Sequence, residues 1–258
     1  MGIKGIILDL DGTLYRGAEE VPGAARFVAD MAARGIRCLF VTNRANRAPR
    51  EVCAQLRGFG IACREGDVLT SAEAVAMYLR RGSAYVVGEQ ALLDELVRQG
   101  FRVTDDNPDY VIVSLDREFT YDKMDRASRA IRAGARFIAT NADKAMTVEG
   151  GLIAPGTGSI VAAIATASGK SPQVIGKPER TIVDMALARL GMAAQDVIMV
   201  GDNVETDMPA GHAAGVRTVL VLTGISSREH VAESPVHPTW IVESFDELRA
   251  VVDRERST

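Results

Sequence analysis

Four short stretches of the sequence place polar side chains directly after a run of apolar residues. The first run, GIILDL, ends in two carboxylates two residues apart, Asp9 and Asp11, and Gly12 follows at once. Side chains along a strand alternate between its two faces, so Asp9 and Asp11 lean the same way. Two like charges that close, partly removed from water at a strand end, repel each other unless a cation lies between them. The sequence therefore predicts a bound cation near these two residues.

Three later apolar runs end in a similar way. Thr42, Asn43 and Arg44 close the run CLFVTNR, Lys177 follows PQVIG, and Asp202 opens the segment DNVETD after DVIMVG. In an open parallel sheet, ligands bind where the carboxyl ends of the strands meet. The pattern therefore predicts that the four stretches share one site.

Each stretch taken alone also has a purely structural interpretation. Asp11 with the glycine after it is typical of a turn, and Thr42 or Asn203 could instead cap a helix. Lys177, which precedes a proline, could be an ordinary surface lysine. Because four strand ends carry such residues in one chain, with carboxylate pairs at the first and the last, the combination favours chemistry over four separate structural roles.

The combined residue types suit a phosphoryl group held beside a metal ion. Asp9, Asp11 and Asp202 offer hard oxygen ligands without a thiolate or a histidine cluster, a set that Mg²⁺ prefers. Lys177 adds a fixed positive charge, and Thr42 and Asn43 add neutral donors. Phosphoryl transfer depends chiefly on positioning and charge stabilisation. One carboxylate near the metal can attack phosphorus, and a second, two residues on, can protonate the leaving oxygen.

The elements that must position these residues alternate between strand-like and helical patterns along the whole chain. Apolar runs such as IRCLFVT and DVIMVG are separated by amphipathic stretches such as EQALLDELVRQG, which predicts an α/β fold with parallel sheets. The sequence predicts more strands than we expect in a single sheet. We therefore expect a core made of residues 1–81 and 173–258, with a smaller α/β domain inserted at 82–172. The polar segment SREHVAESPVHP is expected to form a loop.

Bulk composition narrows the class of protein. The chain has 258 residues, of which 47% are hydrophobic and 25% charged, and a formal net charge of −4, which argues against a general nucleic-acid binder. No apolar run approaches the roughly 18–20 residues of a membrane span, and no secretory signal is recognised at the start. The three cysteines show no CxxC spacing, so we expect reduced thiols in a cytoplasmic protein.

Taken in order, the motifs DLDGTLY, VTN, GKP and GDNVETD resemble the four motifs of the haloacid dehalogenase (HAD) superfamily, and most closely its NagD-like, p-nitrophenyl-phosphatase-type branch. The segments LDREFTY, GARFIATNAD and GTGSIVAAI are similar to the α/β cap domain of that branch, so the resemblance covers nearly the whole chain. It implies a Rossmann-like HAD core with an inserted α/β cap that sets substrate specificity. It also implies Mg²⁺-dependent hydrolysis of a small phosphomonoester, such as a nucleotide or a sugar phosphate.

The resemblance assigns catalytic roles to three residues of the first and third motifs. Asp9 would be the nucleophile that becomes aspartyl-phosphate, and its carboxylate would also bind Mg²⁺. Asp11 would be the general acid/base and would offer its backbone carbonyl to the metal. Lys177 would neutralise charge on the nucleophile and the phosphate.

The fourth motif would complete the metal site. By the same resemblance Asp202 would be the remaining metal ligand, Asp207 would orient water or the motif lysine, and Asn203 would support this arrangement. The dehalogenase branch lacks an acid at the position of Asp11, so its presence favours phosphoester hydrolysis over carbon–halogen cleavage.

Substrate contacts are expected from the second motif and from the inserted domain. Thr42 and Asn43 would hold the phosphoryl oxygens. Family members often read Thr-Asn-Asn-Ser here, whereas this chain has Arg44, which either contacts the phosphate or substrate or points into solvent. Asn141 and Asp143 follow another predicted strand and are candidate substrate contacts.

Two other functions share these motifs. A phosphomutase or phosphotransferase of the same superfamily uses the same nucleophile and metal, and a non-catalytic module that binds a phosphorylated metabolite would keep the site without turnover. A dinucleotide binder and a P-loop NTPase are disfavoured, because no GxGxxG follows the first strand and the SGKS segment lacks the leading glycine. The resemblance also suggests a homodimer through the cap.

Overall fold

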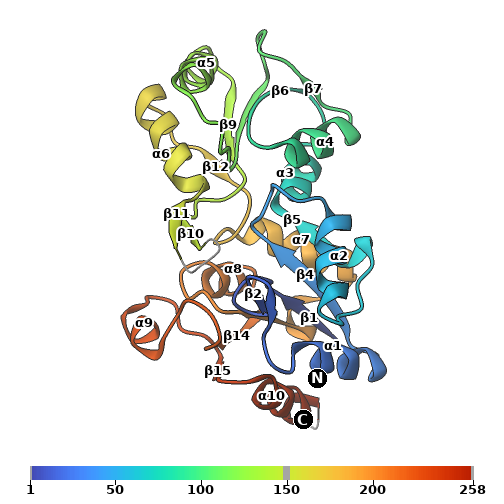
Figure 1. Cartoon of the computed structure of the whole chain (residues 1–258). Helices are drawn as coiled ribbons and strands as arrows, with labels where there is room; N and C mark the ends of the chain where they lie inside the picture. Colours follow the sequence, from blue (N-terminus) through green and yellow to red (C-terminus); the bar gives the residue numbers. More distant parts are fainter. Residues whose placement is uncertain (1, 148–151, 257–258) are drawn as a thin grey trace. The chain divides into compact units, whose positions relative to one another are not determined.

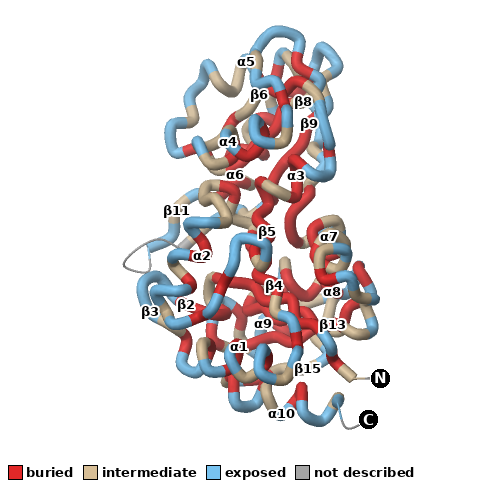
Figure 2. Tube along the Cα trace, turned by 90° about the vertical axis from the view of Figure 1, so that its right-hand side faces the viewer, coloured by how far each residue is buried: buried red, intermediate tan, exposed pale blue. Residues whose placement is uncertain are grey.

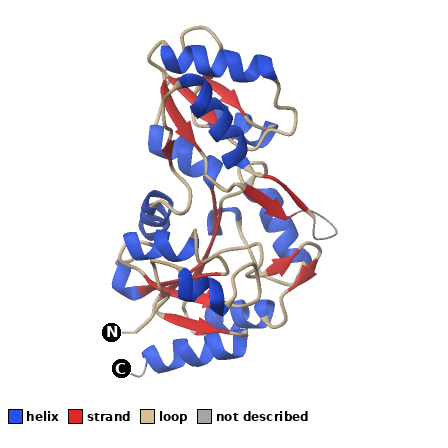
Figure 3. Ribbon diagram, turned by 90° about the vertical axis from the view of Figure 1, so that its left-hand side faces the viewer, coloured by secondary structure: helices blue, strands red, loops and turns tan. Residues whose placement is uncertain are grey.

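The computed structural model describes residues 2–147 and 152–256 and shows strands and helices alternating along the chain (Figures 1 and 3). It is a mixed α/β structure with two largely parallel sheets, which confirms the fold class predicted from the sequence. Each sheet belongs to its own compact unit, named here the core unit and the inserted unit. The core unit comprises Met1–Thr42, Pro49–Leu69 and Lys177–Thr258, and the inserted unit comprises Asn43–Ala48 and Thr70–Gly176.

The inserted unit is larger than the predicted domain at 82–172. It also contains helix α3 (Ser71–Leu79), which packs against α4 (Gln90–Arg98) within the same unit. The short segment Asn43–Ala48, directly after the second motif, groups with it as well. The sequence pattern does not separate α3 from the helices of the core, because α3 continues their strand–helix alternation without a break in composition.

The core unit is built on a sheet with the strand order β15-β14-β13-β1-β4-β5. Its central strand β1 pairs in parallel with β13 on one side and β4 on the other, and Ile7 is aligned with both Met199 and Leu39. Chain order runs outward from β1 in both directions, so the carboxyl ends of β1, β4 and β13 meet at a switch point of the sheet. The strands are β1 Gly5–Leu8, β4 Arg37–Thr42, β5 Val68–Thr70, β13 Val197–Gly201, β14 Arg217–Val221 and β15 Trp240–Val242.

The strands at the centre of this sheet are buried on both faces. All four residues of β1 are buried, and Ile6 and Leu8 belong to a core cluster with Phe27 and Met31 of helix α1. The buried positions of α1 recur at helical spacing, which is why this helix packs against the sheet along one face. Figure 2 shows the buried strands of the core. The helices of the core unit are α1 Ala24–Ala33, α2 Pro49–Gly58, α7 Arg180–Leu190, α8 Asp207–Ala213, α9 Arg228–Glu233 and α10 Phe245–Arg256.

The inserted unit has its own parallel sheet, in the order β12-β9-β8-β6-β7. The central strands and helices α5 and α6 share a separate hydrophobic cluster that includes Val111, Ile131 and Ile164. Strands β10 and β11 pair with each other in a separate antiparallel sheet. The remaining elements of the unit are β6 Ser83–Val87, β7 Arg102–Val103, β8 Tyr110–Val113, α5 Tyr121–Arg132, β9 Arg136–Ala139, β10 Ala145–Thr147, β11 Ile153–Pro155, α6 Thr157–Ser168 and β12 Gln173–Val174.

Two local features differ from the sequence-based expectations. Cys53 and Cys63 form a disulfide, so the prediction of reduced thiols is wrong for this pair; helix α2 and the loop after it bring their Cα atoms to 5.3 Å, a normal disulfide spacing. Cys38 is free. The segment expected to be a loop contains α9, whose first turn is capped by Ser227.

Candidate active site

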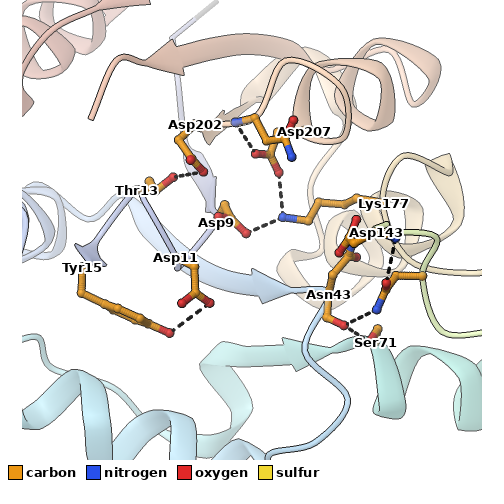
Figure 4. A network of polar contacts seen from close by, with 12 residues as sticks. Asp9, Asp11, Thr13, Tyr15, Asn43, Ser71, Asp143, Lys177, Asp202 and Asp207 are labelled. Atoms are coloured by element: carbon orange, nitrogen blue, oxygen red, sulfur yellow. Dashed lines mark hydrogen bonds and ion pairs between the residues drawn. The ribbon is translucent and has the colours of Figure 1, made fainter. Parts of the chain in front are cut away.

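Asp9 lies directly after β1, at the carboxyl end of the central strand of the core unit. Its backbone N–H donates to the carbonyl of Val200 at 2.9 Å, which continues the pairing of β1 with β13 by one residue. The side chain is only 7% exposed, and its Oδ1 accepts a hydrogen bond from Nζ of Lys177 (Figure 4). A buried carboxylate is thus paired with a buried ammonium at the end of the sheet.

Lys177 contacts a second carboxylate as well. Its Nζ donates to Oδ1 of Asp207 at 2.6 Å, and Asp207 is buried at the start of α8. The other oxygen of Asp207 accepts from the backbone N–H of Asn203 at 3.1 Å. A Cβ at Gly201 would lie 2.2 Å from Asp207 Oδ2, so only glycine fits at the end of β13. The loop geometry therefore places Asp207 against Lys177.

Asp202 is held by backbone and side-chain donors from two other loops. Its Oδ2 accepts from the N–H of Ile225 at 2.8 Å, and Thr13 Oγ1 lies 3.5 Å from Oδ1. A Cβ at Gly12 or Gly224 would lie 2.3 or 1.8 Å from Asp202 Oδ2, so glycine is needed at both positions. These close approaches explain why the first motif reads Asp-Gly.

The electrostatics of this group are dominated by burial. Burial raises the pKa of Asp9 well above its usual value; Lys177 opposes this shift, and Asp207 and Asp202 add to it. Burial, and then Asp207, raise the pKa of Asp202 to about 7. Burial lowers the pKa of Lys177, but the carboxylates of Asp207 and Asp9 outweigh that effect and raise it overall, so Lys177 is an ammonium at neutral pH.

The same carboxylates form a candidate metal centre. One oxygen each of Asp9, Asp202 and Asp207 lie within 4.8 Å of one another, and all three residues are buried. Three carboxylates and the single ammonium of Lys177 leave two negative charges uncompensated, which a divalent cation would neutralise. An all-oxygen donor set suits a hard cation. The residues present therefore fit a divalent metal ion.

Asp11 takes a different position from the one expected of its carboxylate. The carboxylate cluster of the described residues contains Asp207 but not Asp11, although the sequence grouped Asp11 with Asp9 and Asp202. Asp11 Oδ2 instead accepts from the hydroxyl of Tyr15 at 3.4 Å, and the residue is only partly buried. The left-handed Gly12, with φ of 77°, turns the chain away directly after it. The carboxylate of Asp11 thus lies outside the group formed by Asp9, Asp202 and Asp207 and contacts Tyr15 instead.

The predicted residues of the second motif divide between the two units. Thr42 is buried at the end of β4 in the core unit, whereas Asn43 and the partly buried Arg44 belong to the inserted unit. Within that unit Asn43 Nδ2 donates to the carboxylate oxygens of Asp143 at 3.1 and 3.3 Å. The Nδ2 of Asn141 donates to the carbonyl of Asn43 at 2.8 Å. Three of the five residues expected to touch phosphate or substrate, Asn43, Asn141 and Asp143, thus contact one another.

Sequence reasoning missed several residues that hold the site together. Thr223 Oγ1 donates to the carbonyl of Gly12 at 2.7 Å, and Ile225 holds Asp202 through its backbone. Ser71 Oγ donates to the carbonyl of Asn43 at 2.6 Å. A Thr-Gly pair directly after the apolar run VRTVLVL was the available signal for the first contact, because it repeats the pattern of a polar strand end.

The buried carboxylates and the lysine meet at the switch point of a doubly wound sheet, which is where enzymes of this α/β class bind their ligands. Comparison with known proteins gives the family. The family model described as haloacid dehalogenase-like hydrolase matches residues 6–102, and a HAD-hydrolase-like model matches residues 174–248. The chain belongs to the haloacid dehalogenase-like hydrolases, as its motifs predicted.

Named relatives match along almost the whole chain. The 5′-nucleotidase YutF of Bacillus subtilis (strain 168) is 40% identical over 248 residues, which cover 95% of this chain and 96% of that protein. The acid sugar phosphatase of Staphylococcus haemolyticus is 39% identical, over 96% of this chain and 95% of the relative. The solved structure of NagD from Escherichia coli K-12 is similar with a TM-score of 0.89 and 39% identity, covering 96% of this chain and 98% of that one.

Proposed function

We propose that this protein is a Mg²⁺-dependent phosphomonoester hydrolase that acts through an aspartyl-phosphate on Asp9. The chain is a phosphatase of the HAD superfamily, since its relatives of about 40% identity over nearly the full length are named phosphatases. The observation that carries the proposal is the contact of Asp9 with Lys177 in a buried group that also holds Asp202 and Asp207.

Asp9 is the proposed nucleophile. Its oxygen attacks phosphorus, a new oxygen–phosphorus bond forms, and the ester bond to the leaving oxygen breaks. Asp11, which is partly buried and two residues away, gives its proton to the leaving oxygen. Asp11 then takes a proton from the water that attacks the aspartyl-phosphate. This second step releases inorganic phosphate and restores both carboxyl groups.

The charges around Asp9 support this chemistry. Lys177, kept as an ammonium by Asp9 and Asp207, offsets negative charge on the nucleophile and the transferred group. Thr42, at the end of β4, supplies a hydroxyl donor for a phosphoryl oxygen. Asp9 and Asp202, with the backbone carbonyl of Asp11, would hold Mg²⁺, which would supply charge neutralisation for the phosphoryl oxygens. Asp207 would orient Lys177, which it already contacts.

The proposed substrates are small phosphorylated metabolites such as nucleotides or sugar phosphates. Relatives of similar identity are named for both classes, a 5′-nucleotidase and an acid sugar phosphatase. We propose that the inserted unit acts as the cap that selects among them, that the enzyme works in the cytoplasm, and that it forms a homodimer through the cap. Within the residues the structure describes, none of the helices is both long and apolar enough to cross a bilayer.

The proposal is tested by phosphate release from a panel of phosphomonoesters with and without Mg²⁺. Wild-type enzyme should release inorganic phosphate from p-nitrophenyl phosphate, and chelation or Asp9→Asn should abolish release. A rearranged phosphate ester in place of free phosphate would identify a phosphomutase. Binding of phosphate without turnover on the whole panel would identify a non-catalytic module.

A further inference from the structure

Asn43, one of the residues predicted to touch substrate, lies where the chain passes from the core unit to the inserted unit. The unit boundaries fall after Thr42, after Leu69 and before Lys177, and a further one follows Ala48. Two of these boundaries directly adjoin residues of the proposed active site, Thr42 and Lys177. Their neighbours in the inserted unit, Asn43 and Gly176, are joined to those two residues by one peptide bond each.

Asn43 is held by three side chains of its own unit. Its carbonyl accepts from Asn141 Nδ2 at 2.8 Å and from Ser71 Oγ at 2.6 Å, which fixes the peptide plane after Asn43. Its side-chain amide donates to both carboxylate oxygens of Asp143 (Figure 4). Backbone and side chain of Asn43 are therefore both restrained immediately after Thr42.

Gly176 is packed against the same residues. Its N–H donates to the carbonyl of Thr140 at 2.9 Å, next to Asn141 in sequence. A Cβ at Gly176 would lie 2.4 Å from that carbonyl oxygen and 2.6 Å from Oδ1 of Asn43. The residue before Lys177 and the residue after Thr42 are thus in close contact. We call this group the crossing cluster; its members are Asn43, Ser71, Thr140, Asn141, Asp143 and Gly176.

The polar groups of this cluster are already used within the protein. Asn141 is 4% exposed, its Nδ2 donates to the Asn43 carbonyl, and its Oδ1 accepts from the N–H of Asp143 at 3.1 Å. Both ends of the Asn141 amide are therefore engaged. Both oxygens of Asp143 receive the amide of Asn43. Asn141 is buried and Asp143 and Asn43 are partly buried, and a polar network whose members are satisfied in this way rigidifies the local structure.

We propose that Asp143, Asn141 and Ser71 are positioning residues, which act through Asn43 and Gly176 to set the orientation of Thr42 and Lys177. This inference rests on the proposed function and replaces the expectation that Asn141 and Asp143 contact the substrate. If these residues position Thr42 and Lys177, a substitution should lower activity equally on all substrates, because every substrate carries the same phosphoryl group. If they contact the rest of the substrate, the loss of activity should differ from one leaving group to another.

The test compares Asp143→Ala with wild type on p-nitrophenyl phosphate, a nucleoside monophosphate and a sugar phosphate. We expect kcat/KM to fall by about 10- to 100-fold, by a similar factor for all three substrates, since small displacements of catalytic groups carry losses of this size. The Kd for inorganic phosphate, measured by calorimetry with Mg²⁺, should rise in parallel. Asp143→Asn, which keeps an oxygen for the Asn43 amide, should recover most of the loss.

A matched control separates this effect from general damage to the inserted unit. Asp105→Ala removes a carboxylate from the same unit that pairs with Arg126 at 2.9 Å, outside the crossing cluster, and should leave kcat/KM and phosphate binding unchanged. Ser71→Ala is the second variant, since it deletes a single hydroxyl and should show a smaller uniform loss. Thermal unfolding of each variant reports whether it folds.

Several outcomes would overturn the inference. Loss of activity on one substrate class alone, with phosphate binding unchanged, would show that Asp143 contacts the substrate. Additive effects of Asp143→Ala and Asn43→Ala in a double-mutant cycle would show that Asp143 does not act through Asn43. A wild type that binds phosphate but hydrolyses nothing would defeat the proposed function, while the binding measurements would still decide the role of the crossing cluster.

Discussion

At the scale of single residues, the site depends on a buried lysine that contacts two buried carboxylates. Lys177 is 3% exposed and lies against the buried carboxylates of Asp9 and Asp207, so solvent screens these charges only weakly. Such a group is held by mutual attraction, and removing one member leaves the others buried without compensation. The same side chains are therefore expected to contribute both to the proposed catalysis and to the stability of the core unit.

Lys177→Met should abolish turnover and also destabilise the metal-free protein by about 3–5 kcal/mol, because it leaves buried carboxylates without a cation. Urea unfolding in chelator gives the free energy of unfolding. Lys4→Met, which removes an exposed lysine paired with Asp196, is the control and should change it by about 1 kcal/mol or less. If Lys177→Met left the free energy of unfolding unchanged, Lys177 would not be a buried ammonium that compensates the carboxylates of Asp9 and Asp207.

Gly224→Ala should weaken metal binding by about tenfold or more, because the added Cβ would lie 1.8 Å from Asp202 Oδ2 and displace a proposed ligand. Calorimetry with Mn²⁺ in place of Mg²⁺ measures this directly. Gly58→Ala, where a Cβ meets nothing within 4 Å, is the matched control and should bind the metal as wild type does. If Gly224→Ala and Gly58→Ala bound Mn²⁺ with equal affinity, Asp202 would not be a ligand of the metal.

The metal-free protein should lose stability as pH rises from about 4 to about 7. The pKa of Asp202 is raised from 3.8 to about 7, so in this window the folded protein binds more protons than the unfolded chain does, and deprotonation favours unfolding. Urea unfolding at a series of pH values in chelator measures the trend, and Mg²⁺ should reverse it above pH 7. The loss of stability with rising pH should be smaller in Asp202→Asn. A free energy of unfolding that does not change between about pH 4 and about pH 7 in the wild type would contradict the raised pKa of Asp202.

At the scale of elements, β1 and its two neighbours position the site. Strand–helix alternation was readable from the sequence because each central strand is buried on both faces and so reads as an unbroken apolar run. Helix α9 was not readable, because its six residues bury only Val231 and carry no long apolar periodicity. The disulfide of Cys53 with Cys63 was equally hidden, since the spacing of cysteines does not give their distance in space.

Ile6→Ala should lower the free energy of unfolding by about 2–5 kcal/mol, because Ile6 is fully buried in the core cluster and the substitution leaves a cavity. Chemical denaturation checks this value. Val97→Ala, at a side chain that is 59% exposed, should change it by about 0.5 kcal/mol or less. Equal effects at the two positions would mean that β1 is not the centre of a packed sheet.

At the scale of the whole molecule, the sequence predicted which strand ends carry the site, whereas the contacts that hold those ends needed coordinates. We grouped Asp9 with Lys177 because the carboxyl ends of parallel strands share one edge, and in the structure Lys177 Nζ donates to Oδ1 of Asp9. The backbone N–H of Ile225 on Asp202 could not be predicted, since a backbone donor leaves no residue signature. The contact of Asn43 with Asp143 joins residues a hundred positions apart and needed coordinates.

The central claim is that Asp9 attacks phosphorus, and the most direct measurement is mass spectrometry of enzyme quenched in acid during turnover with Mg²⁺. We predict a phosphate adduct on the peptide that contains Asp9, formed as fast as the leaving group is released and missing in Asp9→Asn. Release of the leaving group with no adduct on that peptide at any time, or undiminished turnover by Asp9→Asn, would contradict the account.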